Sequence, residues 1–529
     1  MCEESELRMK KMTISLTTAL FLLLAGCAKE SPSLVFQVSQ TKLGYEGGSV
    51  TFNISSSHPW KLSCDDWWLE TPVSSGKKGN AEFEATAHEN KSSQARSVRV
   101  TVSAGGQART VEIVQAAAHQ EPDVPSGPDT PDDPNPNPPA PADEFSEYKR
   151  SGFKKMKILG YWGPGAEERD KTMTAEKYRE MARCGFTLSL TKNFSVDVVR
   201  QMAAAVDGTG IQLIVGLSSL NEANVNAIKT LPQIYGYYCW DEPTVQEMPS
   251  VVEKIDVYKN ADPSRMCYVN LLPMPARKMF MGVDTYSEYM DEYLKLGIPL
   301  LSYDFYSISG ENMDLHAQYF EALDFMYRTG KEKNYPVWTF VLSYNHGAYY
   351  TTDEATMRFQ AWAGLAYASD CIEYYTYLTP KDAKYGTGLL DLNYLVNDKW
   401  EAARELNARM QGLADVFVGM ELLKVRGIGY STTGLPALAE GELPAPFKSV
   451  RCGLPDGLLM SHFKNGDSEY LMLLNLSFKL SQAVAIDYEE SAPLKEFVAD
   501  GQYVSHFKTR QAASSRVLAP GDMALYQIK

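Results

Sequence analysis

The 529-residue chain has little positive charge. Its 51 lysine and arginine residues are outnumbered by 66 acidic ones, which gives a net charge of −15 and a pI near 5.1. A protein that neutralises the phosphates of a nucleic acid needs a basic face. We therefore expect no nucleic acid partner. An uncharged ligand is compatible with the excess of acidic residues.

Residues that bind metals or act as nucleophiles are also sparse. The chain has eight cysteines with no CxxC pair, and of its seven histidines only His316 and His346 lie in the central part. A zinc site needs closely spaced cysteine and histidine pairs, and a Ser-His-Asp arrangement needs a histidine near its nucleophile. We expect no metal and no other cofactor, so that any hydrolytic chemistry comes from carboxylates.

Long apolar runs are absent except for one near the start, over residues 14–24. It follows Lys10-Lys11 and ends at Leu24-Ala25-Gly26-Cys27, an order typical of a bacterial lipoprotein signal. About ten apolar residues are too few to cross a hydrocarbon core of about 30 Å, which argues against a transmembrane helix. The sequence predicts a signal peptide over residues 1–27. We expect an outer-membrane lipoprotein of a Gram-negative bacterium, exposed at the cell surface and attached to the membrane only through lipid on Cys27.

Residues 34–116 alternate apolar and polar side chains at period two between glycine-rich turns, which predicts a small β-sandwich. The positions of Trp60, Trp67-Trp68-Leu69, Gly105-Gly106 and the closing Val114-Gln115 resemble the BACON domain. That module has an immunoglobulin-like fold and is common at the start of carbohydrate-active lipoproteins. Its tryptophans either form the core of a spacer or offer a platform for stacking on sugar.

Residues 117–147 are rich in proline and acidic side chains. Such a composition cannot bury a core, and a proline-rich chain extends by about 3 Å per residue. We expect this segment to be an extended linker that separates the two parts of the chain.

Residues 148–412 alternate apolar strands with amphipathic helices. Helical patterns cover residues 174–183, 197–205, 248–259, 287–296, 315–327 and 356–367. The strands are expected at residues 156–162, 186–190, 211–216, 234–240, 267–270, 299–304, 336–340 and 371–375. Eight such units predict an α/β fold, the (β/α)₈ barrel, with a doubly wound open sheet as the alternative.

The remaining residues, 413–529, return to β-type runs. They resemble the small antiparallel β-sandwich that often closes the barrels of glycoside hydrolases, where it packs against the barrel. The chain is thus expected to be multidomain, with an all-β domain on either side of the barrel.

Catalytic groups in such barrels lie at the carboxyl ends of the strands. The fourth expected strand ends in Trp240-Asp241-Glu242-Pro243. This resembles the Asn-Glu-Pro strand end of clan A glycoside hydrolases, with aspartate in place of asparagine as in relatives that carry Trp-Asp-Glu-Pro. The resemblance implies that Glu242 is the general acid/base, and the neighbouring Asp241 would help to keep it protonated. The alternative is an acidic pair that caps the following helix.

The second carboxylate departs from that clan, whose nucleophile is a glutamate at the end of strand seven. Here residues 338–346 contain no acid. Asp304, at the end of strand six between aromatic residues, is the preferred substitute, and Glu373 in strand eight is the other. Asp304 could instead hold a loop by hydrogen bonds.

A sugar ring needs flat aromatic surfaces and polar side chains around it. The strand ends supply residues of both kinds, and Glu373 counts among the polar ones. The candidates for substrate binding are Trp162, Tyr238, Trp240, Tyr306, Tyr344 and Tyr377 for stacking, and Lys192, Asn193, Asn270 and Asn345 for bonding hydroxyl groups.

Together these patterns predict a monomeric glycoside hydrolase that acts on a polysaccharide or host glycan at the cell surface through a carboxylate acid/base mechanism. A non-catalytic, glycan-binding lipoprotein with a degenerate barrel is the alternative. A purely structural surface protein is the third possibility.

Overall fold

The structure is a computed structural model that describes residues 33–43, 47–64, 68–90, 96–116, 155–309, 314–345, 352–381, 386–429, 434–492, 494–500 and 503–529. The chain divides into two compact units, Met1–Pro136 and Asn137–Lys529. The expected lipid attachment at Cys27 and the expected linker over 117–147 lie outside the described residues. In the described part of the chain, no helix is both long and apolar enough to span a membrane.

The first unit contains the expected β-sandwich, built from two sheets with the strand orders β1-β3-β7-β5 and β2-β9-β8-β4-β6. Trp60 stacks on Phe83, and Arg96 lies over the ring of Trp68. Both tryptophans are buried, so these two rings form core rather than a surface for stacking on sugar. The strands are β1 (Leu34–Val38), β2 (Lys42–Leu43), β3 (Gly48–Ser56), β4 (Trp60–Cys64), β5 (Leu69–Glu70), β6 (Ser75–Gly76), β7 (Gly79–Ala87), β8 (Arg96–Ala104) and β9 (Gln107–Gln115).

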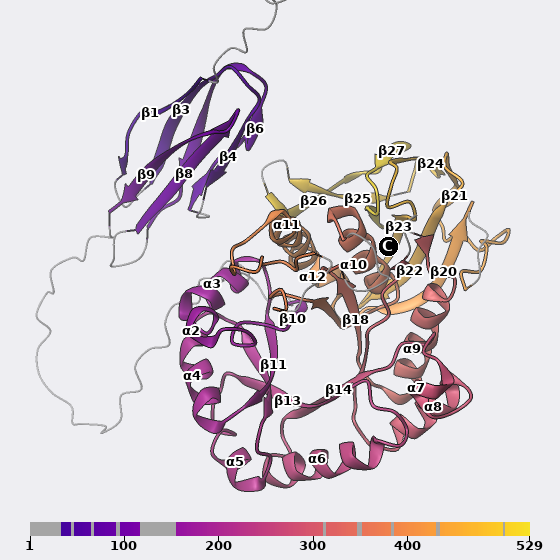
Figure 1. Cartoon of the computed structure of the whole chain (residues 1–529). Coiled ribbons are helices and arrows are strands. Elements are labelled where there is room, and N and C mark those ends of the chain that lie inside the picture. The colour runs from indigo at the N-terminus through magenta and orange to yellow at the C-terminus, as the bar shows by residue number, and fades with distance from the viewer. Residues whose placement is uncertain are drawn as a thin grey trace, which may run out of the picture. The chain divides into compact units, whose positions relative to one another are not determined.

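The second unit is built on a closed barrel of eight parallel strands (Figure 1). The strands are β10 (Lys157–Tyr161), β11 (Leu188–Phe194), β12 (Gln212–Leu217), β13 (Ile234–Asp241), β14 (Met266–Leu271), β15 (Leu301–Tyr303), β18 (Val337–Leu342) and β19 (Cys371–Tyr375). All eight expected strands are confirmed, and the open-sheet alternative is wrong because β19 pairs with β10 and closes the barrel. Strands covered on both faces read as apolar runs, which is why the sequence located them.

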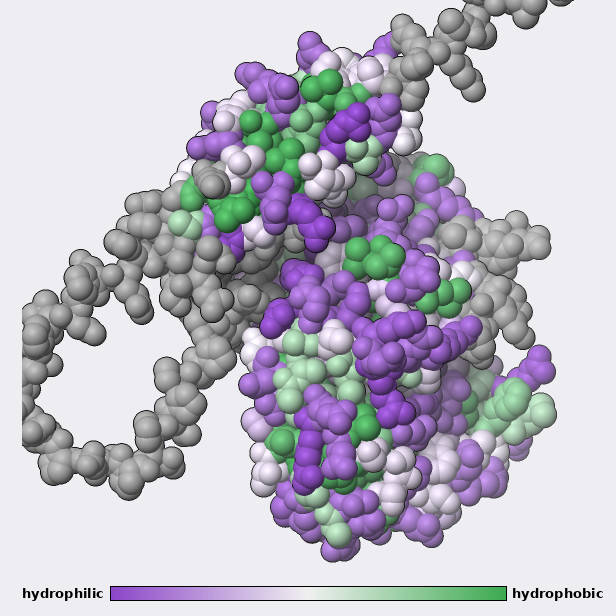
Figure 2. All heavy atoms as spheres, turned by 60° about the vertical axis from the view of Figure 1, so that its left-hand side comes forward, coloured by the Kyte–Doolittle hydropathy of each residue, from purple (hydrophilic) through white to green (hydrophobic). Residues whose placement is uncertain are grey.

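Helices surround the barrel, and several of them begin at a polar residue that caps the first turn. Thr174, Ser195 and Asp353 each accept a backbone N–H of the following first turn. Over the face of the molecule seen in Figure 2, hydrophilic residues predominate and hydrophobic ones are scattered among them. The helices are α2 (Arg169–Thr172), α3 (Ala175–Arg183), α4 (Val196–Val206), α5 (Glu222–Asn226), α6 (Met248–Ala261), α7 (Lys278–Met281), α8 (Tyr286–Leu294), α9 (Tyr319–Lys333) and α10 (Glu354–Ala366).

One expected helix starts later than its pattern indicates. The expected helix over 315–327 begins at Tyr319, because Asp314–Leu315 form β17, which pairs with β16 (Ile308–Ser309) in a short antiparallel ladder. This insertion lengthens the connection between β15 and α9 at the carboxyl end of the barrel.

The chain then continues through α11 (Asp398–Gly412) and α12 (Ala414–Phe417) into two antiparallel sheets with the orders β20-β22-β23-β28-β25-β26 and β21-β24-β27. The sheets pack on the barrel helices. Ser461 Oγ donates to the carbonyl of Ala366 at the end of α10, and Arg409 of α11 pairs with Asp522 at 2.7 Å. The strands are β20 (Glu421–Ile428), β21 (Phe447–Cys452), β22 (Leu458–Asn465), β23 (Ser468–Asn475), β24 (Gln482–Tyr488), β25 (Lys495–Asp500), β26 (Tyr503–Gln511), β27 (Ser515–Leu518) and β28 (Met523–Gln527).

A buried carboxylate links three strands of this C-terminal part. Glu496 of β25 is fully buried and pairs with Arg510 of β26 at 3.3 Å and with Arg516 of β27. Glu496→Gln removes the negative charge while both arginines stay, so we expect the variant to unfold more easily by about 3 kcal/mol. Denaturant unfolding followed by tryptophan fluorescence measures this, with Glu489→Gln, an exposed acid of the same domain, as control. Equal stability of the two variants would contradict the expectation.

Candidate active site at the mouth of the barrel

Asp241, the last residue of β13, is held by donors from three other strands. Its Oδ2 accepts a hydrogen bond from Tyr161 Oη of β10 at 2.9 Å and from Lys192 Nζ of β11 at 3.3 Å. Its Oδ1 accepts from Asn270 Nδ2 of β14 at 3.2 Å. Three donors in fixed directions make Asp241 an anchor for the strand ends around it.

Lys192 places a positive charge among aromatic rings at this mouth. Its Nζ lies 4.9 Å from the ring centroid of Tyr238 and 5.9 Å from those of Tyr161 and Trp162, and it donates to Tyr238 Oη at 3.1 Å. The ring faces and Asp241 together stabilise the cation. Two of the residues expected to bind sugar, Trp162 and Tyr238, therefore lie near the same ammonium group.

Glu242 follows Asp241 in an unusual backbone conformation. Its φ is +49°, in the left-handed region that costs a non-glycine residue about 1–3 kcal/mol and that often occurs at functional sites. Its backbone N–H donates to the carbonyl of Asn270 at 2.8 Å, and the next carbonyl, that of Pro243, accepts from Tyr289 Oη at 2.9 Å. These bonds fix the turn, and the Glu242 side chain remains exposed and accessible.

Asp304 follows β15 and interacts directly with Glu242. Burial, the charges of Glu242 and Asp241, and a hydrogen bond to Glu242 raise the pKa of Asp304 well above its usual value. Glu242 is exposed, but the protein atoms packed around its carboxyl group displace water from it and so raise its pKa, and the hydrogen bond from Asp304 opposes that rise. Two carboxyl groups at hydrogen-bonding distance share a proton because both cannot ionise easily. The pair thus retains a proton at a pH where an isolated carboxyl has lost it.

Glu373 lies deeper in the barrel, in the middle of β19, and is fully buried. Its carboxyl oxygens contact Ser302 Oγ at 2.7 Å and Tyr268 Oη at 2.8 Å. Burial raises the pKa of Glu373 to about 8. It sits beneath the mouth as a neutral acid rather than as a group that substrate can reach.

Aromatic rings form one wall of the mouth. Tyr375, at the end of β19, lies 5.8 Å from Tyr161, 5.9 Å from Tyr306 and 6.2 Å from Tyr344, measured between ring centroids. Burial raises the pKa of Tyr306, and the charge of Asp304 raises it further, which places this ring beside the carboxyl pair. Two more of the expected stacking residues, Tyr306 and Tyr344, thus belong to the same wall.

The structure does not bring the other expected residues into this group. Trp240 lies under Lys254 of α6, whose Nζ is 4.2 Å from the ring centroid. Tyr377 is fully buried against Phe186, and Asn345 Oδ1 accepts from Thr352 within its own loop. Asn193 is exposed at the end of β11 with φ +70°.

The seventh strand supplies no carboxylate, as the sequence indicates. All six residues of β18 are buried, and among them no acid occurs. Asp304, which follows the sixth strand, lies beside Glu242, while Glu373 is held separately by Ser302 and Tyr268.

Sequence reasoning missed four residues of the site, Tyr161, Tyr268, Ser302 and Tyr375. Each lies within or at the end of a barrel strand and bonds or packs against a residue of the mouth. Strand alternation was the available signal, since Tyr268 is two residues before Asn270 and so points to the same side of the barrel.

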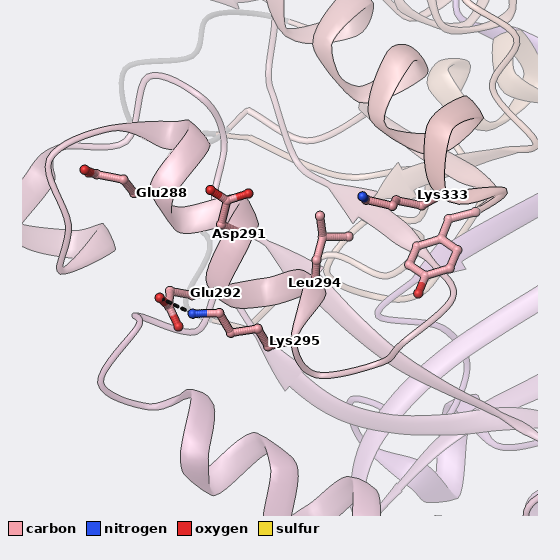
Figure 3. A pocket seen from close by; sticks show the side chains of 7 residues that line it. Glu288, Asp291, Glu292, Leu294, Lys295 and Lys333 are labelled. Atoms are coloured by element: carbon pink, nitrogen blue, oxygen red, sulfur yellow. Dashed lines mark hydrogen bonds and ion pairs between the residues drawn. The ribbon is translucent and has the colours of Figure 1, made fainter.

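Two surface hollows lie away from this mouth. One of about 700 Å³ is lined by charged residues of α8 and by the residues that precede β18. Figure 3 shows Asp291 and Glu292 on α8, with Lys295 paired to Glu292 at 2.6 Å and Lys333 at the end of α9. It shares no lining residue with the carboxyl pair, so the two features are separate.

Comparison with known proteins identifies the first domain. Residues 35–118 match the viral BACON domain family, which agrees with the resemblance seen in the sequence. No curated protein matches the chain.

Among solved structures, a GH42 beta-galactosidase from G. stearothermophilus is similar at 8% identity and a TM-score of 0.45, with 70% of this chain and 98% of that chain covered. A glucosidase from Croceicoccus marinus has 9% identity and a TM-score of 0.39, with 71% and 96% covered. A Bacteroides ovatus GH5 xyloglucanase has 12% identity and a TM-score of 0.29, with 71% and 100% covered. At such values the chemistry of this chain has to be inferred from its own side chains.

Proposed function

We propose that the protein hydrolyses a glycosidic bond in a polysaccharide or host glycan at the barrel mouth. The observation that carries this proposal is the contact between Glu242 and Asp304, two carboxyl groups that share one hydrogen bond. Burial raises the pKa of both groups, and the contact raises that of Asp304 further. Cleavage of a glycosidic bond requires one carboxyl that still holds a proton and a second that is close by.

In this proposal Glu242 is the general acid/base, because it is exposed and can reach a glycosidic oxygen. Asp304, which donates the hydrogen bond of the pair, acts as the nucleophile or base beneath it once its proton has passed along that bond to Glu242. Its Oδ1 is shielded from solvent and has no hydrogen-bond partner among the described residues, so in this proposal the mouth opens at this atom before a reacting carbon reaches it. Asp241 holds the strand ends through Tyr161 and Asn270.

The contact between the carboxyl groups also favours one stereochemical outcome. Inverting enzymes separate the two groups by about 6.5–9.5 Å to admit water, and retaining enzymes by about 5–5.5 Å. A hydrogen-bonded pair is nearer to the shorter separation, so we propose that the product keeps the anomeric configuration of the substrate. NMR of the first product formed distinguishes the two outcomes.

We further propose that the chain is a lipid-anchored monomer at the surface of a Gram-negative cell. The signal-like start and lipobox cysteine of the sequence support this location. Labelling with palmitate, and its loss in Cys27→Ala, tests the anchor.

The activity itself is tested with a panel of plant, microbial and host glycans. We expect the mature, unlipidated protein to release reducing sugar from at least one of them. Retention of a glycan without release would instead support the binding protein with a degenerate barrel, and neither retention nor release would support a structural protein.

A further inference from the structure

Around the buried carboxyl of Glu373, the hydrogen-bonding contacts outnumber the protons that are available to form them. Four contacts join it with its neighbours: Ser302 Oγ to Glu373 Oε1 at 2.7 Å and to Asn270 Oδ1 at 3.2 Å, and Tyr268 Oη to Glu373 Oε2 at 2.8 Å and to Ser302 Oγ at 2.9 Å. Each contact needs one proton, and the two hydroxyl groups supply only two. With ionised Glu373, two contacts are therefore left as repulsions between lone pairs.

A proton on Glu373 removes one of these repulsions and gives the network a direction. Glu373 then donates to Ser302, Ser302 donates to Asn270 Oδ1, and the other end of the Asn270 amide donates to Asp241 at 3.2 Å. Asn270 Oδ1 can accept but not donate, so Ser302 must give its proton there. Because Glu373 supplies its own proton for the contact with Ser302, the Ser302 proton can bond to Asn270 Oδ1. That bond keeps the other end of the Asn270 amide directed at Asp241.

The surroundings of Glu373 favour this neutral state. Burial raises its pKa, the hydrogen bonds of Ser302 and Tyr268 lower it in part, and the negative charge of Asp241 on β13 raises it again, to about 8 in all. Tyr268 of β14 faces the carboxyl, and Cys371 of its own strand keeps its proton because burial raises the pKa of that thiol. On the neighbouring β18, Val337–Leu342, no side chain titrates.

We propose that Glu373 is a positioning residue of the active site, held as a neutral acid whose proton keeps the Asn270 amide bonded to Asp241, so that loss of this proton at alkaline pH turns the site off. The proposal rests on the hydrolase function above. When Glu373 gives its proton to solvent, Ser302 turns its own proton to Glu373 Oε1. Asn270 Oδ1 then loses its donor, and the amide is free to rotate away from Asp241.

Glu373→Gln tests this, because a glutamine amide offers a donor and an acceptor as the neutral acid does but cannot ionise. We expect the wild type to lose activity above about pH 8, by about tenfold for each further pH unit, and the glutamine variant to keep its neutral-pH activity well beyond that point. An alkaline limb that is the same in both proteins would overturn the proposal.

Two further variants serve as comparisons. Glu373→Leu has no donor and should be at least about tenfold less active than Glu373→Gln at every pH, if it folds. Asp370→Asn changes another carboxyl of the same strand end, one that accepts from the Val337 N–H, and should keep the wild-type pH profile. Equal activity of the leucine and glutamine variants at neutral pH would count against the role of the proton.

Thermal unfolding gives a reading that does not depend on activity. The pKa of Glu373 rises on folding from 4.5 to about 8, so between these values the folded protein holds a proton that the unfolded chain has released. Wild-type stability therefore falls as pH rises from about 4.5 to about 8, and ionisation of Glu373 causes no further fall above that. The Tm of Glu373→Gln minus that of the wild type should increase from about pH 4.5 to about pH 8 and then stay constant. A difference that does not change with pH would show that Glu373 is not held as a neutral acid.

If no glycan is cleaved at any pH, the proposed function fails, and the orientation of Asn270 is still measurable. NMR of asparagine side-chain amides labelled with ¹⁵N should show the Asn270 signal shift near pH 8 in the wild type and not in Glu373→Gln. Asn270→Asp identifies the signal by its disappearance. A wild-type Asn270 signal that does not respond to pH overturns the proposal.

Discussion

Glu242→Gln is expected to lower the rate of sugar release by about 10²–10⁴-fold while glycan binding remains within a few-fold of the wild type. Glutamine has nearly the same shape and keeps the left-handed backbone bonded to Asn270 through its N–H. It cannot donate a proton to the leaving oxygen as an acid does. Initial rates on the best glycan, together with a dissociation constant from calorimetry, separate the two effects.

Glu247→Gln is the matched control for this change. Glu247 lies in the same loop, is exposed, and accepts the backbone N–H of Thr244. A glutamine oxygen can still accept that bond, so the control should retain full activity. Unchanged turnover in Glu242→Gln would remove Glu242 from the role of acid, and equal losses in both variants would point to the loop fold instead.

Asp304→Asn is expected to lower activity by at least about 10²-fold and also to shift the pH profile. The charge of Asp304 no longer opposes ionisation of the pair, and an asparagine N–H donates to ionised Glu242. Both changes stabilise the anionic form of Glu242, whose pKa should fall. The residual kcat/KM should therefore begin to fall on the alkaline side at a lower pH than that of the wild type.

The measurement is kcat/KM against pH, with Asp314→Asn as control. Asp314 is an exposed residue of β17 in the same connection after β15 and should leave both rate and profile unchanged. A shift of the Asp304→Asn limb to higher pH would contradict the shared proton. An unaltered rate would show that Asp304 only supports its loop.

The sequence located the barrel because its strands are covered on both faces. The runs over residues 213–217 and over β18 carry so few polar residues that they indicate strands covered on both faces. The carboxyl pair was also predictable, since Glu242 and Asp304 both follow a strand and strand ends meet at one mouth. The C-terminal sheets were apparent from the return of β-type runs after residue 413.

Side-chain direction at the strand ends was less predictable. Simple alternation from Tyr238 would turn Trp240 into the mouth, but the pairing of β13 with β14 shifts register between these two residues, and Trp240 lies under Lys254 of α6. Such a bulge leaves no mark in one sequence. The hydrogen bonds that join Tyr268, Ser302 and Glu373 were missed for a different reason. A hydroxyl or carboxyl group in a barrel strand cannot be told from any other polar residue of a strand until its partners are known.

The packing of α10 has a consequence for how this protein can be divided. Ten of its thirteen residues are buried, because β18 lies on one side of the helix and the C-terminal sheets lie on the other. A helix with apolar side chains buried on two sides would expose one of them to water if either neighbour were removed. Cutting the chain between the barrel and its C-terminal sheets would therefore divide one continuous core, whereas the N-terminal sandwich is built around a separate core of its own.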